Sequence, residues 1–400
     1  MEIYFDNAAT TRVYDEAAEL MVKVMTVDYG NPSSLHMKGV EAEKYIKYAK
    51  KVFAGIMKVD EKELIFTSGG TESNNMALAG AAAAACRRGR HIISTGIEHA
   101  SVYNPLFDLE EKGYEVTYLP VDAQGMTDLE ALRSAVRPDT ILVSVMGVNN
   151  EIGTVQPIAD IVKTVKAVNP QTLIHMDAIQ TFGKMQVYPK RLGIDMLSIS
   201  GHKFHGPKGI GLLWVRDKVR VIPQILGGGQ QKGMRSGTEN VPGIAGMARA
   251  AELEYEGLAE KIDRLYRLRE DFIAKVSALE GTHVNGSLQR GDITSPASAG
   301  ACAAPHIVSV SFDSIRAEVL LHTLEEHGIY VSSGSACSSN HPAISGTLKA
   351  IGVTGPHLDG TLRFSFCYDT TQDEIDECIR VLAQVLPVLR RFAPKRSGRR

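Results

Sequence analysis

Residues 196–215, MLSISGHKFHGPKGIGLLWV, place two short apolar segments on either side of a turn rich in glycine. We expect a strand over 196–200 and another over 211–215, because both segments favour extended structure and glycine and proline interrupt the chain between them. The turn carries Lys203 directly after the first strand, where partial burial favours a neutral, nucleophilic amine. A loop lysine is more commonly a solvated charge, so this position by itself leaves both interpretations open.

Similar segments occur from about residue 60 to 220, where short apolar runs alternate with amphipathic helical stretches. This alternation is typical of βαβ units that build a mostly parallel sheet covered by helices on both faces. The other predicted strands are 64–67, 91–95, 115–119, 141–148 and 173–177. The sequence therefore predicts an α/β fold in which a mostly parallel seven-stranded sheet lies between helices.

The rest of the chain predicts a smaller α+β unit. A charged helical region at about 245–279 leads into it, and residues 295–305, which are small and punctuated by proline, are expected to form a loop. The expected strands and helix of this unit are 306–312, 329–332, 360–367 and 371–386. We expect a large domain over 15–260 and a small domain built from 1–14 and 261–400.

Composition narrows the possible functions. The 400 residues are 44% hydrophobic and 22% charged with a net charge of −2, which excludes disordered chains and small disulfide scaffolds. No field spanning the molecule recruits nucleic acid or an acidic membrane, so neither is an expected partner. Residues 390–400 hold six basic and no acidic side chains. Such a tail can contact RNA or an acidic partner, but more often it is a solvated terminus.

The cysteines and the N-terminal segment indicate a cytoplasmic protein. The five cysteines form no CxxC pair, which argues against a disulfide framework or a zinc ribbon and fits a reducing compartment. Residues 1–11 lack the charged and apolar parts of a secretory signal. The longest uncharged apolar run, 76–86, is far shorter than the ~20 residues that span a bilayer.

Polar side chains gather where the predicted strands end. Thr71, His99, Asn150, Asp177 and Lys203 each lie at or just beyond the carboxyl end of one strand. In open α/β sheets these ends meet at one edge and form the ligand crevice. The chain has neither a GxGxxG turn after the first strand nor a GxxxxGK motif, so the expected ligand is not a dinucleotide or a nucleoside triphosphate.

Three of these features together describe pyridoxal 5'-phosphate. Backbone N–H groups and the Thr71 hydroxyl at a helix start can surround a phosphate, although serine and threonine are also common helix caps. A buried carboxylate such as Asp177 needs a cationic partner, which a protonated pyridine nitrogen or an arginine supplies. Lys203 supplies the amine that captures an aldehyde. His202 and His205 have the spacing of a metal pair, but no third ligand lies nearby in sequence, so no metal is predicted.

Further motifs run in order over nearly the whole chain. They are Tyr4–Thr11, Gly30–Ser34 with His36, Thr71–Glu72, Glu98–His99, Asn149–Gly153, Asp177–Gln180, Ser200–Lys203, Gly206–Gly211, Gly227–Gly229, Arg235–Thr238, Ser333–Cys337 and Arg363–Ser365. Through them the sequence resembles the cysteine desulfurases, pyridoxal-phosphate enzymes of fold type I in the class V aminotransferase group. The resemblance implies a homodimer that releases L-alanine from L-cysteine and passes the sulfur to an acceptor protein.

The resemblance also assigns roles around the cofactor. It implies that Lys203 forms the Schiff base, that Asp177 pairs with the pyridine nitrogen and that Gln180 bonds the ring hydroxyl. His99 is expected to stack on the ring and move protons. The implied phosphate contacts are Thr71, Ser200, His202 and, from the partner subunit, Thr238.

For the substrate carboxylate the resemblance implies Asn150 and Arg363. Strand alternation supports Arg363 independently, because it sends this side chain to the face opposite Phe364 and Phe366. A planar guanidinium suits bidentate binding of a carboxylate.

Cys337 is the predicted nucleophile that receives the sulfur as a persulfide. It lies in a run of serine and glycine within the loop 332–346 and coincides with the nucleophile of the family. The other cysteines have less favourable settings: Cys86 and Cys378 are expected to be apolar fillers on helices, Cys302 an exposed residue without chemistry around it, and Cys367 a possible neighbour of the pocket.

Two features of the sequence bear on which protein accepts the sulfur. The Gly-Ser-Ala-Cys loop resembles the longer-loop desulfurases that serve iron-sulfur cluster and thionucleoside pathways, which leaves an iron-sulfur scaffold or a tRNA-thiolation enzyme as acceptor. The basic residues 390–400 do not match the ending by which some relatives dock a scaffold. Alternatives are a selenocysteine lyase or another pyridoxal-phosphate transaminase, and more distantly a non-catalytic sulfur carrier or RNA-associated scaffold.

Overall fold

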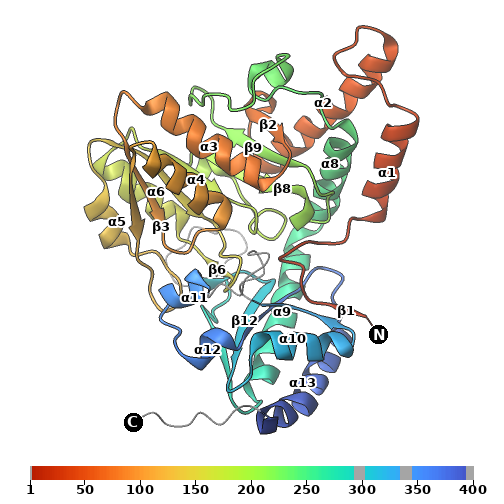
Figure 1. The fold of residues 1–400 in the computed structure, drawn as a ribbon. Helices are drawn as coiled ribbons and strands as arrows, with labels where there is room; N and C mark the ends of the chain where they lie inside the picture. The colour runs from red at the N-terminus through yellow and green to blue at the C-terminus, as the bar shows by residue number, and fades with distance from the viewer. Residues whose placement is uncertain (1, 292–301, 334–344, 393–400) are drawn as a thin grey trace.

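The computed structural model describes residues 2–291, 302–333 and 345–392 (Figure 1). Its main sheet has seven strands in the order β2-β9-β8-β7-β5-β3-β4. Their bounds are Leu64–Thr67 (β2), His91–Thr95 (β3), Glu115–Leu119 (β4), Thr140–Met146 (β5), Leu173–Asp177 (β7), Met196–Ser200 (β8) and Gly211–Val215 (β9). Only β9 runs against its neighbours, so the predicted mostly parallel seven-stranded sheet is confirmed.

Helices cover both faces of this sheet (Figure 1). One face packs against α3 (Gly70–Ala85) and α4 (Ala100–Glu111). The other packs against α1 (Asp15–Thr26), α2 (Met37–Met57), α5 (Leu129–Ala135), α6 (Ile158–Val168) and α8 (Val241–Tyr255). Because the inner strands are buried on both faces, they read as continuous apolar runs, which is why the sequence located them well.

A second, smaller sheet has the order β10-β12-β15-β14. Its strands are Thr282–Asn285 (β10), Ile307–Phe312 (β12), Ser332–Ser333 (β14) and Thr361–Ser365 (β15). It shares a core with α9 (Leu258–Ser277), α10 (Ala317–Glu326) and α13 (Gln372–Phe392). The N-terminal strand β1 (Ile3–Tyr4) joins this part of the molecule by pairing with β13 (Ile329–Tyr330). The domain limits 15–260 and 261–400 themselves stay a prediction.

Short elements complete the chain. They are η1 (Glu61–Glu63), β6 (Thr154–Val155), α7 (Pro189–Leu192), η2 (Gly201–Lys203), η3 (Gln230–Gly233), β11 (Cys302–Ala303), α11 (Gly346–Ala350) and α12 (Pro356–Asp359). None of the helices in the described ranges combines the length and apolar character needed to span a bilayer.

Three expectations need correction. The helical region 245–279 is two helices, α8 and α9, because Gly257 adopts a left-handed φ of 62° between them. The expected strand 329–332 is split between two sheets, with β13 beside β1 and β14 beside β15. Of the predicted loop 295–305, the described part includes β11, which pairs with β6 because its backbone groups need partners in the interior.

The second core, which lies between the small sheet and helices α9, α10 and α13, depends on the aromatic residue Phe364 of β15. Phe364 is fully buried and packs against Phe272 and Phe312. Phe364→Ala should lower the free energy of unfolding by about 3–5 kcal/mol, since it leaves a cavity among these rings. Urea unfolding followed by circular dichroism measures the change. Phe392→Ala, at a side chain that is 82% exposed, is the matched control and should change stability little; equal effects of both substitutions would contradict this account of the core.

Candidate active site

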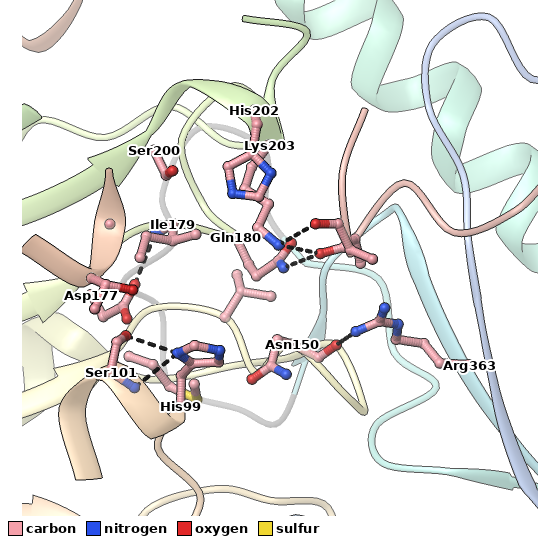
Figure 2. A pocket seen from close by; sticks show the side chains of 16 residues that line it. His99, Ser101, Asn150, Asp177, Ile179, Gln180, Ser200, His202, Lys203 and Arg363 are labelled. Atoms are coloured by element: carbon pink, nitrogen blue, oxygen red, sulfur yellow. Dashed lines mark hydrogen bonds between the residues drawn. The ribbon is translucent and has the colours of Figure 1, made fainter. Parts of the chain in front are cut away.

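A cavity of about 330 Å³ opens at the carboxyl ends of the main strands (Figure 2). The structure brings together there most of the predicted site residues: Thr71, His99, Asn150, Asp177, Gln180, Ser200, His202, Lys203 and Arg363. Thr238 lies elsewhere, beside Tyr29 and Gly30 in a separate pocket. Cys337 lies outside the described residues.

Lys203 enters the cavity from the turn η2, directly after β8. Its Nζ donates to the backbone oxygens of Ala8 and Ala9, both at 2.7 Å (Figure 2). The N-terminal segment therefore forms one wall of the cavity and orients the lysine, although it lies almost two hundred residues away in sequence.

Asp177 is only 4% exposed and ends β7 at the bottom of the cavity. Its Oδ1 accepts from the Ile179 N–H at 2.9 Å, and its Oδ2 accepts from Asn74 Nδ2 at 2.8 Å. Burial raises the pKa of Asp177, and the hydrogen bonds and the nearby His99 and Lys203 only partly oppose this effect. A buried carboxylate in this state gains from a cation placed against it, which is what a protonated pyridine nitrogen supplies.

His99 caps α4 and lies near Asp177. Its Nδ1 accepts the backbone N–H of Ser101 at 3.1 Å, so the proton of the neutral ring lies on Nε2. The Ser101 hydroxyl contacts the same Nδ1 at 2.8 Å and accepts from Asn74 Nδ2 at 2.9 Å. A continuous network therefore joins His99 to Asp177 through Ser101 and Asn74.

One end of the cavity suits a phosphate. The helix α3 begins at Gly70 with unpaired N–H groups typical of a helix start, and Thr71, Ser200 and His202 line the cavity beside it. A Cβ on Gly70 would lie 2.2 Å from Ile179 Cδ1, so a larger residue here requires the Ile179 side chain to move. Burial, followed by the charges of Lys203 and Lys208, lowers the pKa of His202 to about 4, which makes its ring a neutral partner.

Gln180 and Arg363 complete the walls. Gln180 donates from Nε2 to the Ala8 oxygen at 2.8 Å, and its Oε1 lies 3.3 Å from His306 Nε2. Arg363 is 5% exposed and donates to the Asn150 oxygen and to Asp6 Oδ1, each at 2.8 Å. Its Nε is buried and has no hydrogen-bond partner among the described residues. The prediction that Arg363 faces away from Phe364 and Phe366 is confirmed, because Arg363 lines the cavity whereas the two phenylalanines pack in the second core.

Several residues around the cavity were not singled out from sequence for these contacts. Asn74 and Ser101 lie in the first turns of α3 and α4 and orient the carboxylate and the imidazole. Glu98 accepts from Thr95 Oγ1 and the Met146 N–H, and burial, with the nearby Asp177, raises its pKa to about 8. These residues could have been found from the sequence, because each is a polar residue that lies just after a predicted strand or about one helical turn further on.

The cysteine predictions had mixed outcomes. Cys378 is buried in the second core as expected, whereas Cys86 is exposed at the end of α3 and is no apolar filler. Cys302 is partly buried rather than exposed, because β11 packs it against the small cluster around Val155. Cys367 is buried but does not line the cavity, since β15 ends at Ser365 and the chain turns away.

Comparison with known proteins agrees with this geometry. Residues 3–378 match the family model of class-V aminotransferases. The chain is 42% identical to a cysteine desulfurase IscS of Methanosarcina thermophila over 98% of this chain and 94% of that protein. It is 40% identical to cysteine desulfurase IscS 1 of Archaeoglobus fulgidus, with 98% of each chain covered.

A solved structure shows the same fold. The structure titled NifS-like protein superposes with a TM-score of 0.89 at 40% identity and covers 97% of this chain and all of its own. The chain belongs to the class-V aminotransferase family and, within it, to the cysteine desulfurases, which depend on pyridoxal 5'-phosphate.

Asn74 provides a test of the network below the cofactor. Asn74→Ala removes the donor to Asp177 and leaves that carboxylate less oriented, so the affinity for pyridoxal 5'-phosphate should fall about tenfold, the size expected for a lost hydrogen bond to a charged group. Equilibrium dialysis with the free cofactor measures the dissociation constant. The neighbouring Asn75, whose side chain is exposed and bonds the Thr71 oxygen, is the control as Asn75→Ala. An unchanged constant in Asn74→Ala would refute this role.

Proposed function

We propose that the cavity holds pyridoxal 5'-phosphate with its ring nitrogen against Asp177 and its phosphate at the start of α3. Support comes from the buried carboxylate with a raised pKa, and from Thr71, Ser200 and His202 at the opposite end. When bound, the cofactor supplies an electron sink that stabilises negative charge on the substrate carbon next to the amino group. Lys203 is the residue that holds it covalently.

The substrate is oriented by its carboxylate. Arg363 and Asn150 line the cavity, and within the described part of the chain Arg363 Nε has no hydrogen-bond partner. A substrate carboxylate satisfies that donor with a charge-assisted hydrogen bond, which a neutral group does not provide. We infer that these two residues fix the amino acid so that its Cα–H bond points towards Lys203.

Proton transfer falls to Lys203 and His99. Lys203 Nζ removes the proton from the substrate Cα, and the backbone oxygens of Ala8 and Ala9 hold the amine in place. His99 carries a proton on Nε2 in its neutral form and acts with Lys203 in protonating the product carbon. Glu98 next to it is kept largely protonated near neutral pH by its raised pKa, so it adds little negative charge beside Asp177.

Sulfur transfer is assigned to Cys337. Its thiolate attacks the sulfur of L-cysteine, so that an S–S bond forms, the Cβ–S bond breaks, and its electron pair stays with carbon. Protonation of that carbon gives L-alanine and leaves a persulfide on Cys337. The observation that carries the proposal is the convergence of the cofactor residues on one cavity in a chain about 40% identical to named cysteine desulfurases.

The proposal extends to assembly, acceptor and location. Apolar side chains of α1 and of the segment leading to α2 are exposed, among them Val22, Met25, Tyr29 and Leu35. Thr238 lines a pocket together with Met25 and Tyr29 of this surface. If a second copy of the chain covered this surface, Thr238 of the first copy would reach the phosphate site of the second copy.

The proposed acceptor of the sulfur is an iron-sulfur scaffold or a tRNA-thiolation enzyme. The thiols of Cys86, Cys367 and Cys378 form no disulfide, which suits the proposed cytoplasmic location.

Replacing Cys337 separates cofactor binding from sulfur transfer. Cys337→Ala should retain bound cofactor but lose the extra sulfur on this peptide and most alanine formation, by about a hundredfold or more, because the nucleophile is absent. Mass mapping after incubation with L-cysteine and an alanine assay give the two readouts. Cys86→Ala, at an exposed thiol remote from the cavity, is the control. Normal alanine release by Cys337→Ala would disprove the assignment.

Arg363 provides a test of substrate binding. Arg363→Lys keeps the charge but loses the planar fork, so KM for L-cysteine should rise about tenfold or more while the cofactor stays bound. Steady-state kinetics measure KM and kcat separately. Arg316→Lys, at an exposed arginine paired with Glu318, is the matched control. A KM equal to that of the wild type would exclude Arg363 as the carboxylate ligand.

A further inference from the structure

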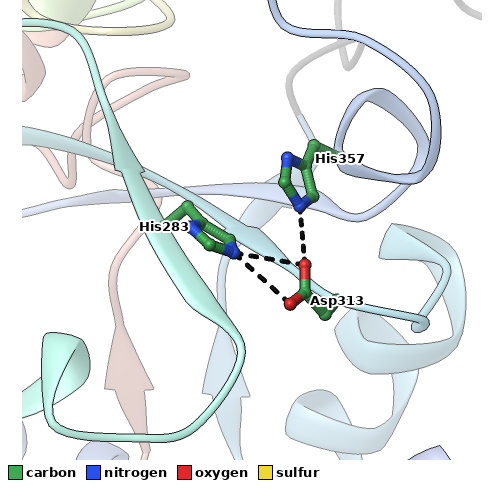
Figure 3. A group of neighbouring side chains, drawn as sticks. All are labelled: His283, Asp313 and His357. Atoms are coloured by element: carbon green, nitrogen blue, oxygen red, sulfur yellow. Dashed lines mark hydrogen bonds and ion pairs between the residues drawn. The ribbon is translucent and has the colours of Figure 1, made fainter.

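Two histidines and an aspartate meet beside the small sheet (Figure 3), and none of them lines the cofactor cavity. His283 comes from β10, Asp313 follows β12, and His357 belongs to α12. Both imidazole rings turn Nε2 towards the same carboxylate (Figure 3). This cluster is not apparent from the sequence, because its members are separated by 30 and 44 positions.

The ligand atoms already lie close to the spacing that a metal ion requires. His283 Nε2 is 3.2 Å from Asp313 Oδ1, and His357 Nε2 is 2.6 Å from the same oxygen. All three groups offer an atom within 4.8 Å of the others. In a tetrahedral zinc site with bonds of about 2.0–2.2 Å, the ligand atoms lie about 3.3 Å apart. The contacts between the imidazoles and the Asp313 carboxylate would therefore have to lengthen by less than about 1 Å to accommodate the ion.

The backbone around the cluster is fixed. The Asp313 N–H donates to the Gly281 oxygen at 2.9 Å, and Thr361 Oγ1 donates to the His357 oxygen at 2.6 Å. Arg390 donates to the backbone oxygens of Gly281 and Asp313. The guanidinium thus bonds main-chain oxygens, and the carboxylate is left to the two imidazoles.

The chemistry of the set selects a class of cation. Asp313 offers a carboxylate oxygen that lies within reach of both imidazoles. Two neutral imidazoles and one carboxylate are the ligands preferred by Zn²⁺ and related late transition ions, whereas Mg²⁺ and Ca²⁺ prefer oxygen alone. The three side chains are roughly 40–50% exposed, so solvent reaches the ligand atoms.

We propose that His283, Asp313 and His357 form a binding site for a divalent late transition metal ion of the zinc type, with water in the remaining position. The ion replaces the hydrogen bonds between the imidazoles and the carboxylate. It ties β10 and the turn after β12 to α12, which directly precedes the strand that carries Arg363. The site is separate from the cofactor chemistry and stands whether or not the proposed function holds.

Zinc binding to the cofactor-loaded protein tests the site. Equilibrium dialysis against micromolar zinc chloride, with metal analysis of the protein, gives the number of bound ions for each chain. The wild type should retain one ion more than His283→Ala and His357→Ala, and about tenfold or greater weakening is expected in Asp313→Asn. His322→Ala removes an exposed histidine of α10 that bonds Glu325 and should behave as the wild type. The wild type and these variants contain the same cysteines, so zinc bound by thiols contributes equally to each measurement and cancels in the comparison.

Thermal unfolding provides a second readout that does not depend on counting ions. Zinc should raise the Tm of the wild type and of His322→Ala but not of His283→Ala, because only a ligand that binds the folded site stabilises it. Circular dichroism establishes that each variant is folded. Equal zinc content in the wild type and both alanine variants, or an equal zinc-induced change in Tm, would overturn the proposal.

Discussion

The carboxylate of Asp177 imposes the main constraint on this structure. It lies almost out of reach of water, where an ionised group without a cationic partner is unfavourable. The protein offers two hydrogen bonds to it and places the residues of the cavity so that a cationic ring can lie against it. In the proposed arrangement, the bound cofactor would relieve an electrostatic penalty that the folded chain carries on its own.

The same constraint explains the network around the carboxylate. Asn74 donates to both Asp177 and Ser101, and Ser101 in turn contacts His99. A shift of any one of these side chains moves the others, so the Asp177 carboxylate and the His99 imidazole stay aligned as a unit. Glu98 lies partly buried beside them, and its raised pKa limits the repulsion between two neighbouring carboxyl groups.

The sequence predicted the main sheet well because its inner strands are buried on both faces and appear as continuous apolar runs. Polar residues after these runs located most of the cavity, since parallel strands end at one edge. The break at Gly257 was harder to see, because charged helical sequence continues on both sides. Asn74 and Ser101 were missed as partners because their roles depend on how two helix starts approach each other in space. Thr238 lies apart from the cavity within one chain, and a role there depends on a partner.

The N-terminal segment links the two ends of the chain within the site. Ala8 and Ala9 hold Lys203 through their carbonyl oxygens, Asp6 holds Arg363, and Asn7 bonds the Ser365 oxygen. Both flanks of the cavity are therefore complete only when β15 has folded against a segment that is synthesised long before it. During translation, a growing chain cannot assemble this pocket until β15 has left the ribosome, so the cofactor is captured in its final geometry only after that point.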